Sequence, residues 1–149
     1  MDLFHYVCKI FINNMLELKN ILKYWKTIVA VLTIALLTLK PVPADIPSFF
    51  LFRLPHFDKV VHVAMFAALA ICIYVDFVKS ANIRKQITDA LTILCISAIY
   101  GAIIEIIQNT WIPMRSGDIL DWAADVVGAL IALTAAITAD KRIRQTNTN

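Results

Sequence analysis

The sequence predicts an all-α integral membrane protein with four transmembrane helices and both termini on the cytoplasmic side. Of its 149 residues, 60% are hydrophobic, and the mean hydropathy is +0.72. A soluble domain is usually about 45–50% apolar, and a chain this small has little interior in which to bury the excess. Two further observations are four apolar stretches and an uneven distribution of lysine and arginine between the segments that join them.

Residues 1–23 are predicted to be a cytoplasmic, amphipathic segment. Apolar residues recur every three or four positions from Phe4 to Leu22, with lysines between them, so an interfacial helix is one interpretation. A second interpretation is that translation starts at Met15, because a short basic stretch followed by an apolar run is an ordinary start for a membrane protein. No small-x-small site follows the first apolar core, which argues against a cleaved signal peptide.

The membrane domain is predicted to cover residues 24–139. Its four spans are predicted at residues 24–39, 60–78, 87–108 and 119–139. The first is short against the roughly 20 residues that a spanning helix needs, and Tyr24 and Trp25 are its expected interfacial anchors. Three prolines between residues 41 and 47 then begin an irregular loop. Residues 140–149 are predicted to be a polar cytoplasmic tail.

The orientation follows from lysine and arginine, which concentrate in cytoplasmic segments. One side holds Lys9, Lys19, Lys23, Lys26, Lys79, Arg84, Lys85, Lys141, Arg142 and Arg144, and the other holds Lys40, Arg53, Lys59 and Arg115. Both termini are therefore expected inside. The first-to-second and third-to-fourth loops are expected to face outward.

This topology gathers polar residues from three predicted helices at the outward face. The start of the second span, the end of the third and the start of the fourth all lie there. The predicted cluster consists of Asp58, Lys59, His62, Glu105, Gln108, Arg115, Asp118, Asp121 and Asp125. Ionisable groups at the edge of a bilayer are costly unless they are paired or functional. The cluster is therefore the candidate ligand-binding site, and it forms an outward-facing polar pocket.

Helical spacing supports this grouping, because residues three or four apart share one face of a helix. Asp58 and His62 are separated by four positions, and Asp118, Asp121 and Asp125 follow one stripe. Some members also have a structural interpretation. Asp118 stands where a helix N-cap belongs, and Lys59 fits an interfacial anchor.

A structural network remains an alternative to a functional site. Arg115 is the only basic residue beside four carboxylates, those of Glu105, Asp118, Asp121 and Asp125, so it is expected to pair with at least one of them. A network of Arg115, Asp121 and Glu105 would then only hold the helices in register.

Other classes of site are not predicted. Cys8, Cys72 and Cys95 form no CxxC motif and no disulfide framework. His62 with aspartates and glutamates offers oxygen and imidazole ligands, but no spaced motif such as HExxH supports a metal site. No metal or cofactor is therefore expected. The net charge of +3 is spread in short clusters beside apolar stretches, which favours lipid contacts over a nucleic-acid partner.

The polar motifs resemble those of the VanZ-like family of small bacterial integral membrane proteins. D-K-x-x-H runs from Asp58 to His62, E-x-x-Q ends the third span, and R-S-x-D-x-x-D runs from Arg115 to Asp121. The resemblance covers about residues 55–132. One departure is Asp125, where the family usually has asparagine, and the carboxylate adds a negative charge or a bound proton.

The resemblance implies a multi-pass protein of the bacterial cytoplasmic (inner) membrane. The family's namesake is associated with resistance to the glycopeptide antibiotic teicoplanin. The first hypothesis is a cell-envelope protein that binds or remodels a lipid-linked or cell-wall precursor, with Lys59 and Arg115 on an anionic group. The second is an enzyme acting on such a lipid, with Glu105 or Asp121 as general acid or base and His62 as proton partner. The third is a structural or partner-binding membrane subunit, and the sequence leaves its oligomeric state open.

Overall fold

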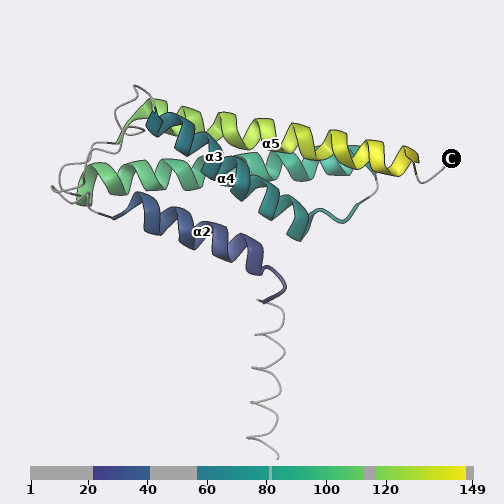
Figure 1. Cartoon of the computed structure of the whole chain (residues 1–149), viewed down its shortest axis with the longest axis horizontal. Helices are drawn as coiled ribbons and strands as arrows, with labels where there is room; N and C mark the ends of the chain where they lie inside the picture. The colour runs from purple at the N-terminus through teal and green to yellow at the C-terminus, as the bar shows by residue number, and fades with distance from the viewer. Residues whose placement is uncertain (1–21, 41–56, 81, 113–116, 147–149) are drawn as a thin grey trace, which may run out of the picture.

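The computed structural model describes residues 22–40, 57–80, 82–112 and 117–146, and all regular structure within them is helical. The helices are α2 (Trp25–Thr38), α3 (Phe57–Phe77), α4 (Ile83–Trp111) and α5 (Ile119–Thr146) (Figure 1). The prediction of an all-α membrane protein is therefore confirmed. The predicted amphipathic segment falls almost entirely outside the described residues, as does the proline-containing loop.

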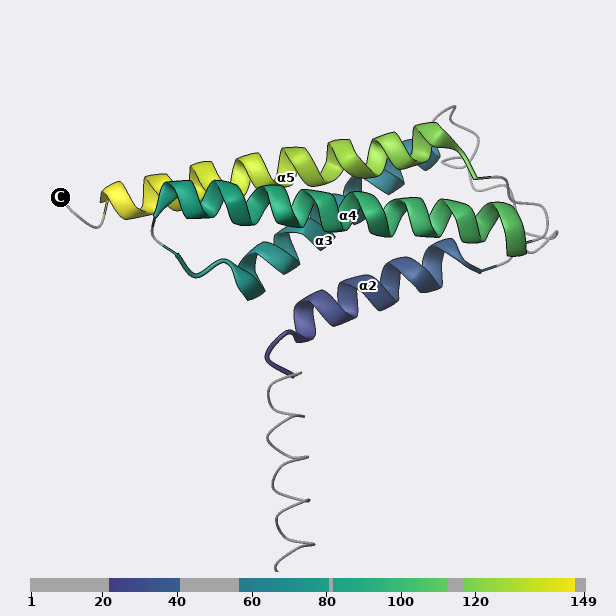
Figure 2. The same cartoon turned by 180° about the vertical axis from the view of Figure 1, so that it is seen from behind.

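The four helices form a bundle in which successive helices run in opposite directions (Figures 1 and 2). α3 packs most extensively against α5, while α4 also packs on α5 and α2 lies against α3. The bundle has two ends. We call the end where α3 and α5 begin and α4 finishes the His62 end. The Asp76 end is the one where α2 and α4 begin and α3 finishes.

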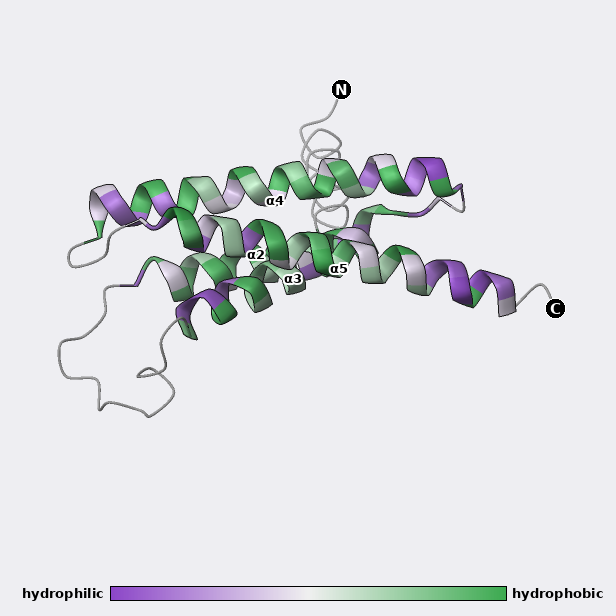
Figure 3. Ribbon diagram, turned by 90° about the horizontal axis from the view of Figure 1, so that it is seen from above, coloured by the Kyte–Doolittle hydropathy of each residue, from purple (hydrophilic) through white to green (hydrophobic). Residues whose placement is uncertain are grey.

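Three helices in the described part of the chain are long and apolar enough to cross a membrane: α3, α4 and α5. Large apolar side chains such as Ile99 and Ile131 are exposed on them, as expected of surfaces that face lipid. Apolar residues predominate along these helices, and polar residues gather at the C-terminal part of α5 (Figure 3). α2 has 14 residues and is shorter than a usual span. The number of crossings and the orientation remain predictions.

Close approach of α3 and α5 brings their polar residues together. Phe66 and Leu69 of α3 are buried against Ala129 and Leu133 of α5. A Cβ atom added at Gly128 would lie 2.2 Å from the Val63 carbonyl oxygen. Glycine is therefore needed for the two backbones to pack at this distance, as small residues commonly allow in membrane helices.

α4 and α5 extend beyond the spans predicted from hydropathy. α4 begins at Ile83 because Asn82 caps it, its side-chain oxygen accepting from the backbone N–H of Arg84 at 2.9 Å. α5 continues past residue 139 to Thr146, so most of the predicted tail is helical. An ion pair one turn apart, between Arg144 Nε and Asp140 Oδ2 at 2.9 Å, accompanies this extension. Hydropathy marks the apolar part of a helix, whereas caps and charge pairs set its ends.

Candidate functional site

The candidate site lies at the His62 end, where α3, α4 and α5 carry polar side chains into the bundle. Eight of the nine predicted cluster residues belong to the described part of the chain. Arg115 lies outside it, so its pairing remains a prediction. The buried members are His62 of α3, Glu105 and Gln108 of α4, and Asp121 and Asp125 of α5.

His62 and Asp125 form a buried hydrogen-bonded pair between α3 and α5. The His62 Nδ1 and Asp125 Oδ1 atoms are 2.9 Å apart, and the exposed fractions of the two residues are 3% and 0%. Gly101 of α4 makes room for this pair, because a Cβ atom there would lie 2.6 Å from Asp125 Oδ2. The pair therefore depends on side chains or backbone from all three helices.

Glu105 ties α4 to the start of α5. Its Oε2 atom accepts a hydrogen bond from the backbone N–H of Asp118 at 2.8 Å. Gly117 comes close to the same turn of α4, since a Cβ atom at Gly117 would lie 2.6 Å from the Glu105 carbonyl oxygen. The chain enters α5 directly over Glu105, which buries this carboxylate.

Lys59 bridges two carboxylates at the start of α5. Its Nζ atom lies 2.9 Å from Asp118 Oδ2 and 2.8 Å from Asp121 Oδ1. Asp118 also accepts from the backbone N–H of Leu120 at 2.9 Å, so the predicted N-cap is confirmed. The hydrogen bond from Lys59 lowers the pKa of the Asp118 carboxyl below its usual value. Lys59 therefore acts as a cross-link between α3 and α5, as well as standing near the edge of the apolar region.

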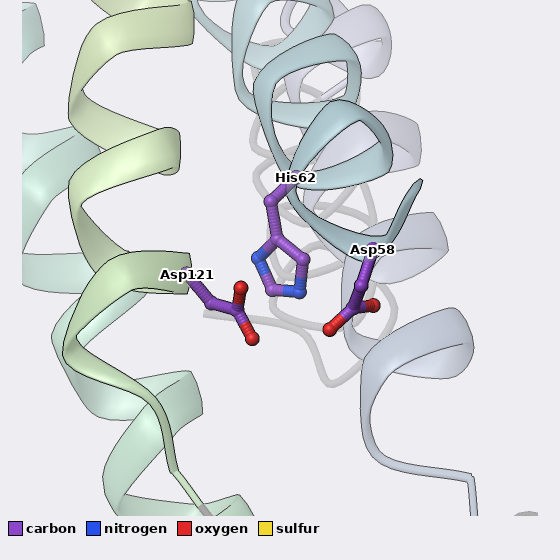
Figure 4. A group of neighbouring side chains, drawn as sticks. All are labelled: Asp58, His62 and Asp121. Carbon is purple, nitrogen blue, oxygen red and sulfur yellow. The ribbon is translucent and has the colours of Figure 1, made fainter. Parts of the chain in front are cut away.

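Side chains from α3 and α5 converge around the His62 ring. Asp58, His62 and Asp121 each place a potential ligand atom within 4.8 Å of the others, as their side chains in Figure 4 illustrate. His62, Glu105 and Asp125 form a second such group within the same distance. His62 belongs to both groups. The histidine is therefore the centre of the cluster, and sequence spacing alone did not single it out.

Two carboxylate oxygens in the cluster have no hydrogen-bond partner among the described residues. They are Glu105 Oε1 and Asp125 Oδ2, and both atoms are buried. Buried polar atoms in folded proteins are nearly always hydrogen-bonded, to protein or to water. A network serving only to hold the helices together would be expected to use these oxygens. Each oxygen therefore calls for a partner outside the described residues: a bound proton, an ion, a ligand, a water molecule or Arg115.

The family of the chain is shown by comparison with protein-family models. The model of the VanZ/LLP1 family matches residues 5–140. The chain belongs to the VanZ/LLP1 family. This confirms the resemblance seen in the motifs and extends it over nearly the whole sequence. No curated protein and no solved structure matches the chain.

Gln108 takes a different position from the other predicted site residues of this VanZ/LLP1 family protein. Its Nε2 atom donates to the backbone carbonyl of Thr38 at 3.0 Å. The bond ties the C-terminal turn of α2 to α4, as the Tyr100 hydroxyl does further along by donating to the Val31 carbonyl at 2.8 Å. Gln108 thus attaches α2 to the bundle.

The structure also contains an apolar groove of about 360 Å³ between α2 and α3. Its lining includes Trp25, Ile34, Met65 and Cys72, and none of the predicted cluster residues. The groove is therefore distinct from the polar cluster, and the predicted outward-facing pocket remains a prediction.

Proposed function

We propose that this VanZ/LLP1 family protein is a multi-pass protein of the bacterial cytoplasmic membrane that acts on a lipid-linked or cell-wall precursor by acid–base chemistry. The observation that supports this most is the buried His62–Asp125 pair beside Glu105. Histidine and carboxylate side chains are the usual agents of general acid–base catalysis. Anchoring a helix requires none of these groups at this depth.

The geometry supports a division of roles within the cluster. Asp125 holds one nitrogen of His62 by a 2.9 Å hydrogen bond, which fixes the ring as a carboxylate does in catalytic triads. Asp58 is exposed and lies within 4.8 Å of His62, so the cluster connects to the surface. A substrate hydroxyl or amide at that rim would exchange a proton with His62, while Glu105 supplies a second carboxylate.

The alternative is a binding or remodelling protein in which Lys59 and Arg115 contact an anionic group. The structure bears on Lys59, whose ammonium group is already held by Asp118 and Asp121. An anionic ligand would share this ammonium group with two carboxylates that repel it. The acid–base proposal requires no such contact and is the one that we favour.

The test is a mass-spectrometric profile of membrane lipids and cell-wall precursors. It compares cells that lack the protein with cells that express the wild type or Glu105→Gln at equal abundance. We expect one species to accumulate in the null strain and in the variant, because glutamine keeps the shape but cannot exchange a proton. Teicoplanin susceptibility, measured in the same strains, would change in parallel if this species determines it.

The matched control is Asp140→Asn, which also replaces a carboxylate by an amide but at the Asp76 end. It should leave the profile as in the wild type. An unchanged profile in all strains, or a Glu105→Gln profile equal to the wild type, would contradict the acid–base role.

A further inference from the structure

We propose that His62, Glu105 and Asp125 bind a divalent transition-metal ion of the Zn²⁺ or Mn²⁺ type. The proposal concerns the same cluster as the proposed function but gives it a different use, because a His62 bound to a metal ion does not exchange a proton with a substrate. It also goes beyond the sequence, in which no spaced ligand motif predicts a metal. Two observations support it. The three residues group their potential ligand atoms closely, and two of them, Glu105 and Asp125, each have a buried oxygen without a hydrogen-bond partner among the described residues.

The three ligands come from three helices, one each from α3, α4 and α5. Their potential ligand atoms all lie within 4.8 Å of one another. Zn²⁺ binds nitrogen and oxygen ligands at about 2.0–2.2 Å, which places the ligands of one ion about 3–4 Å apart. Modest side-chain movement would therefore bring the three atoms into a coordination sphere without moving the helices.

The unpartnered oxygens supply a second and independent observation. Glu105 and Asp125 each use one oxygen within the protein, for the Asp118 N–H and for His62 respectively. The other oxygen of each is buried without a hydrogen-bond partner among the described residues. The exposed fractions of the two residues are only 8% and 0%. One carboxylate oxygen of each residue lies within 4.8 Å of a His62 ring nitrogen, so a cation bound there would supply the partner that these carboxylates lack.

Charge balance favours a doubly charged ion. The cluster buries three carboxylates, those of Glu105, Asp121 and Asp125. Lys59 contacts Asp121 at 2.8 Å. No described lysine or arginine forms a salt bridge with the other two, and His62 balances Asp125 only when its ring is protonated. A divalent ion would balance Glu105 and Asp125 together. The competing arrangement is a proton bound between the two carboxyl groups, which the experiment must separate from metal binding.

The ligand types indicate which ion would bind. Imidazole suits zinc and other transition metals, whereas Mg²⁺ and Ca²⁺ prefer sites made of oxygen alone. A metal-bound histidine usually donates its other N–H to a carboxylate. Asp58 and Asp121, which converge on the His62 ring (Figure 4), can accept that proton. The ion would then take Nδ1, and the 2.9 Å contact of Nδ1 with Asp125 Oδ1 would join two ligands of the ion in place of a hydrogen bond. The Asp118 N–H likewise fixes the orientation of Glu105.

The experiment measures metal binding by the full chain, purified in detergent without a histidine tag. The protein is stripped with EDTA, dialysed separately against Zn²⁺ and Mn²⁺, and its metal content is measured by mass spectrometry. We expect one ion per chain. Glu105→Gln and Asp125→Asn should each weaken the affinity at least tenfold, since changes even to the groups around metal ligands cost about 10–100-fold.

Asp140→Asn is the matched control and should bind as the wild type does. X-ray absorption of the zinc-loaded wild type provides a test that needs no variant: nitrogen and oxygen ligands including one imidazole are expected. Wild-type protein that retains neither ion would overturn the proposal and leave the shared proton. Undiminished binding by a folded Glu105→Gln/Asp125→Asn double variant, or sulfur ligands from a cysteine, would overturn it as well.

Discussion

The two ends of the bundle both bury aspartates, but they treat them differently. At the Asp76 end, Asp76 accepts hydrogen bonds from Lys26 Nζ at 3.1 Å and from the Thr27 backbone N–H and hydroxyl at 3.1 and 2.9 Å. Both of its oxygens are used. At the His62 end, Asp125 and Glu105 each use one oxygen and leave the other without a partner among the described residues.

This contrast supports the proposed distinction between carboxylates that stabilise the fold and carboxylates of the proposed site. A buried carboxylate whose oxygens are all hydrogen-bonded joins helices, as Asp76 joins α3 to α2. A buried carboxylate with an unused oxygen carries a desolvation cost that folding alone does not return. Buried carboxylates of this kind are commonly found in binding and catalytic sites, where function requires them despite their cost in stability. We therefore expect substitutions at the Asp76 end to reduce stability, and those at the His62 end to change the chemistry of the site.

The largest stability effect should come from Asp76→Ala. The substitution leaves the Thr27 N–H and the Lys26 ammonium group without their acceptor, and it should lower the free energy of unfolding by about 2–3 kcal/mol. This is less than the usual cost of breaking a buried ion pair, because the Lys26 side chain is 40% exposed. Glu105→Gln should change the free energy of unfolding by less than about 1 kcal/mol. Unfolding in mixed detergent micelles, followed by helical circular dichroism, measures both. A larger loss of stability for Glu105→Gln than for Asp76→Ala would contradict the distinction between a stabilising Asp76 end and a functional His62 end.

Two glycine substitutions make the same comparison with less disturbance. Gly128→Ala places a methyl group against the Val63 backbone, which cannot move aside, and should cost about 1–3 kcal/mol through overpacking. Gly101→Ala places its methyl group against the Asp125 side chain, whose Oδ2 atom is the nearest at 2.6 Å. It should cost less stability but displace Asp125 from His62. The same unfolding assay, with metal content as the second measurement, distinguishes the two. Equal destabilisation without a change in metal binding would show that Gly101 serves packing alone.

The helices and most of the described members of the cluster were predictable because they depend on local patterns. Apolar stretches located the helices of the described chain, and alternation of direction placed Asp58, Glu105 and Asp121 at one end. The pairing of His62 with Asp125 was not predictable, since it depends on how α3 is rotated against α5. Nor was the role of Gln108, because the position of α2 is set by tertiary packing. The unpartnered oxygens depend on side-chain distances that no sequence pattern encodes.

The smallest effect is expected at the exposed rim of the His62 end. Asp118→Asn keeps an oxygen to cap α5 but removes the charge facing Lys59. Because the pKa of Asp118 is lowered in the folded protein, its charge stabilises the fold above the ordinary aspartate pKa near 3.8. That contribution is lost as the pH falls through the lowered folded value. The difference in melting temperature between the wild type and Asp118→Asn should therefore be positive at pH 7 and vanish in strong acid. Carboxylates present in both the wild type and the variant affect both melting temperatures alike, so their titration cancels in the difference. A difference in melting temperature that grows on acidification would show that Asp118 stabilises the protein in its protonated form. Its ion pair with Lys59 would then not be the source of the stabilisation.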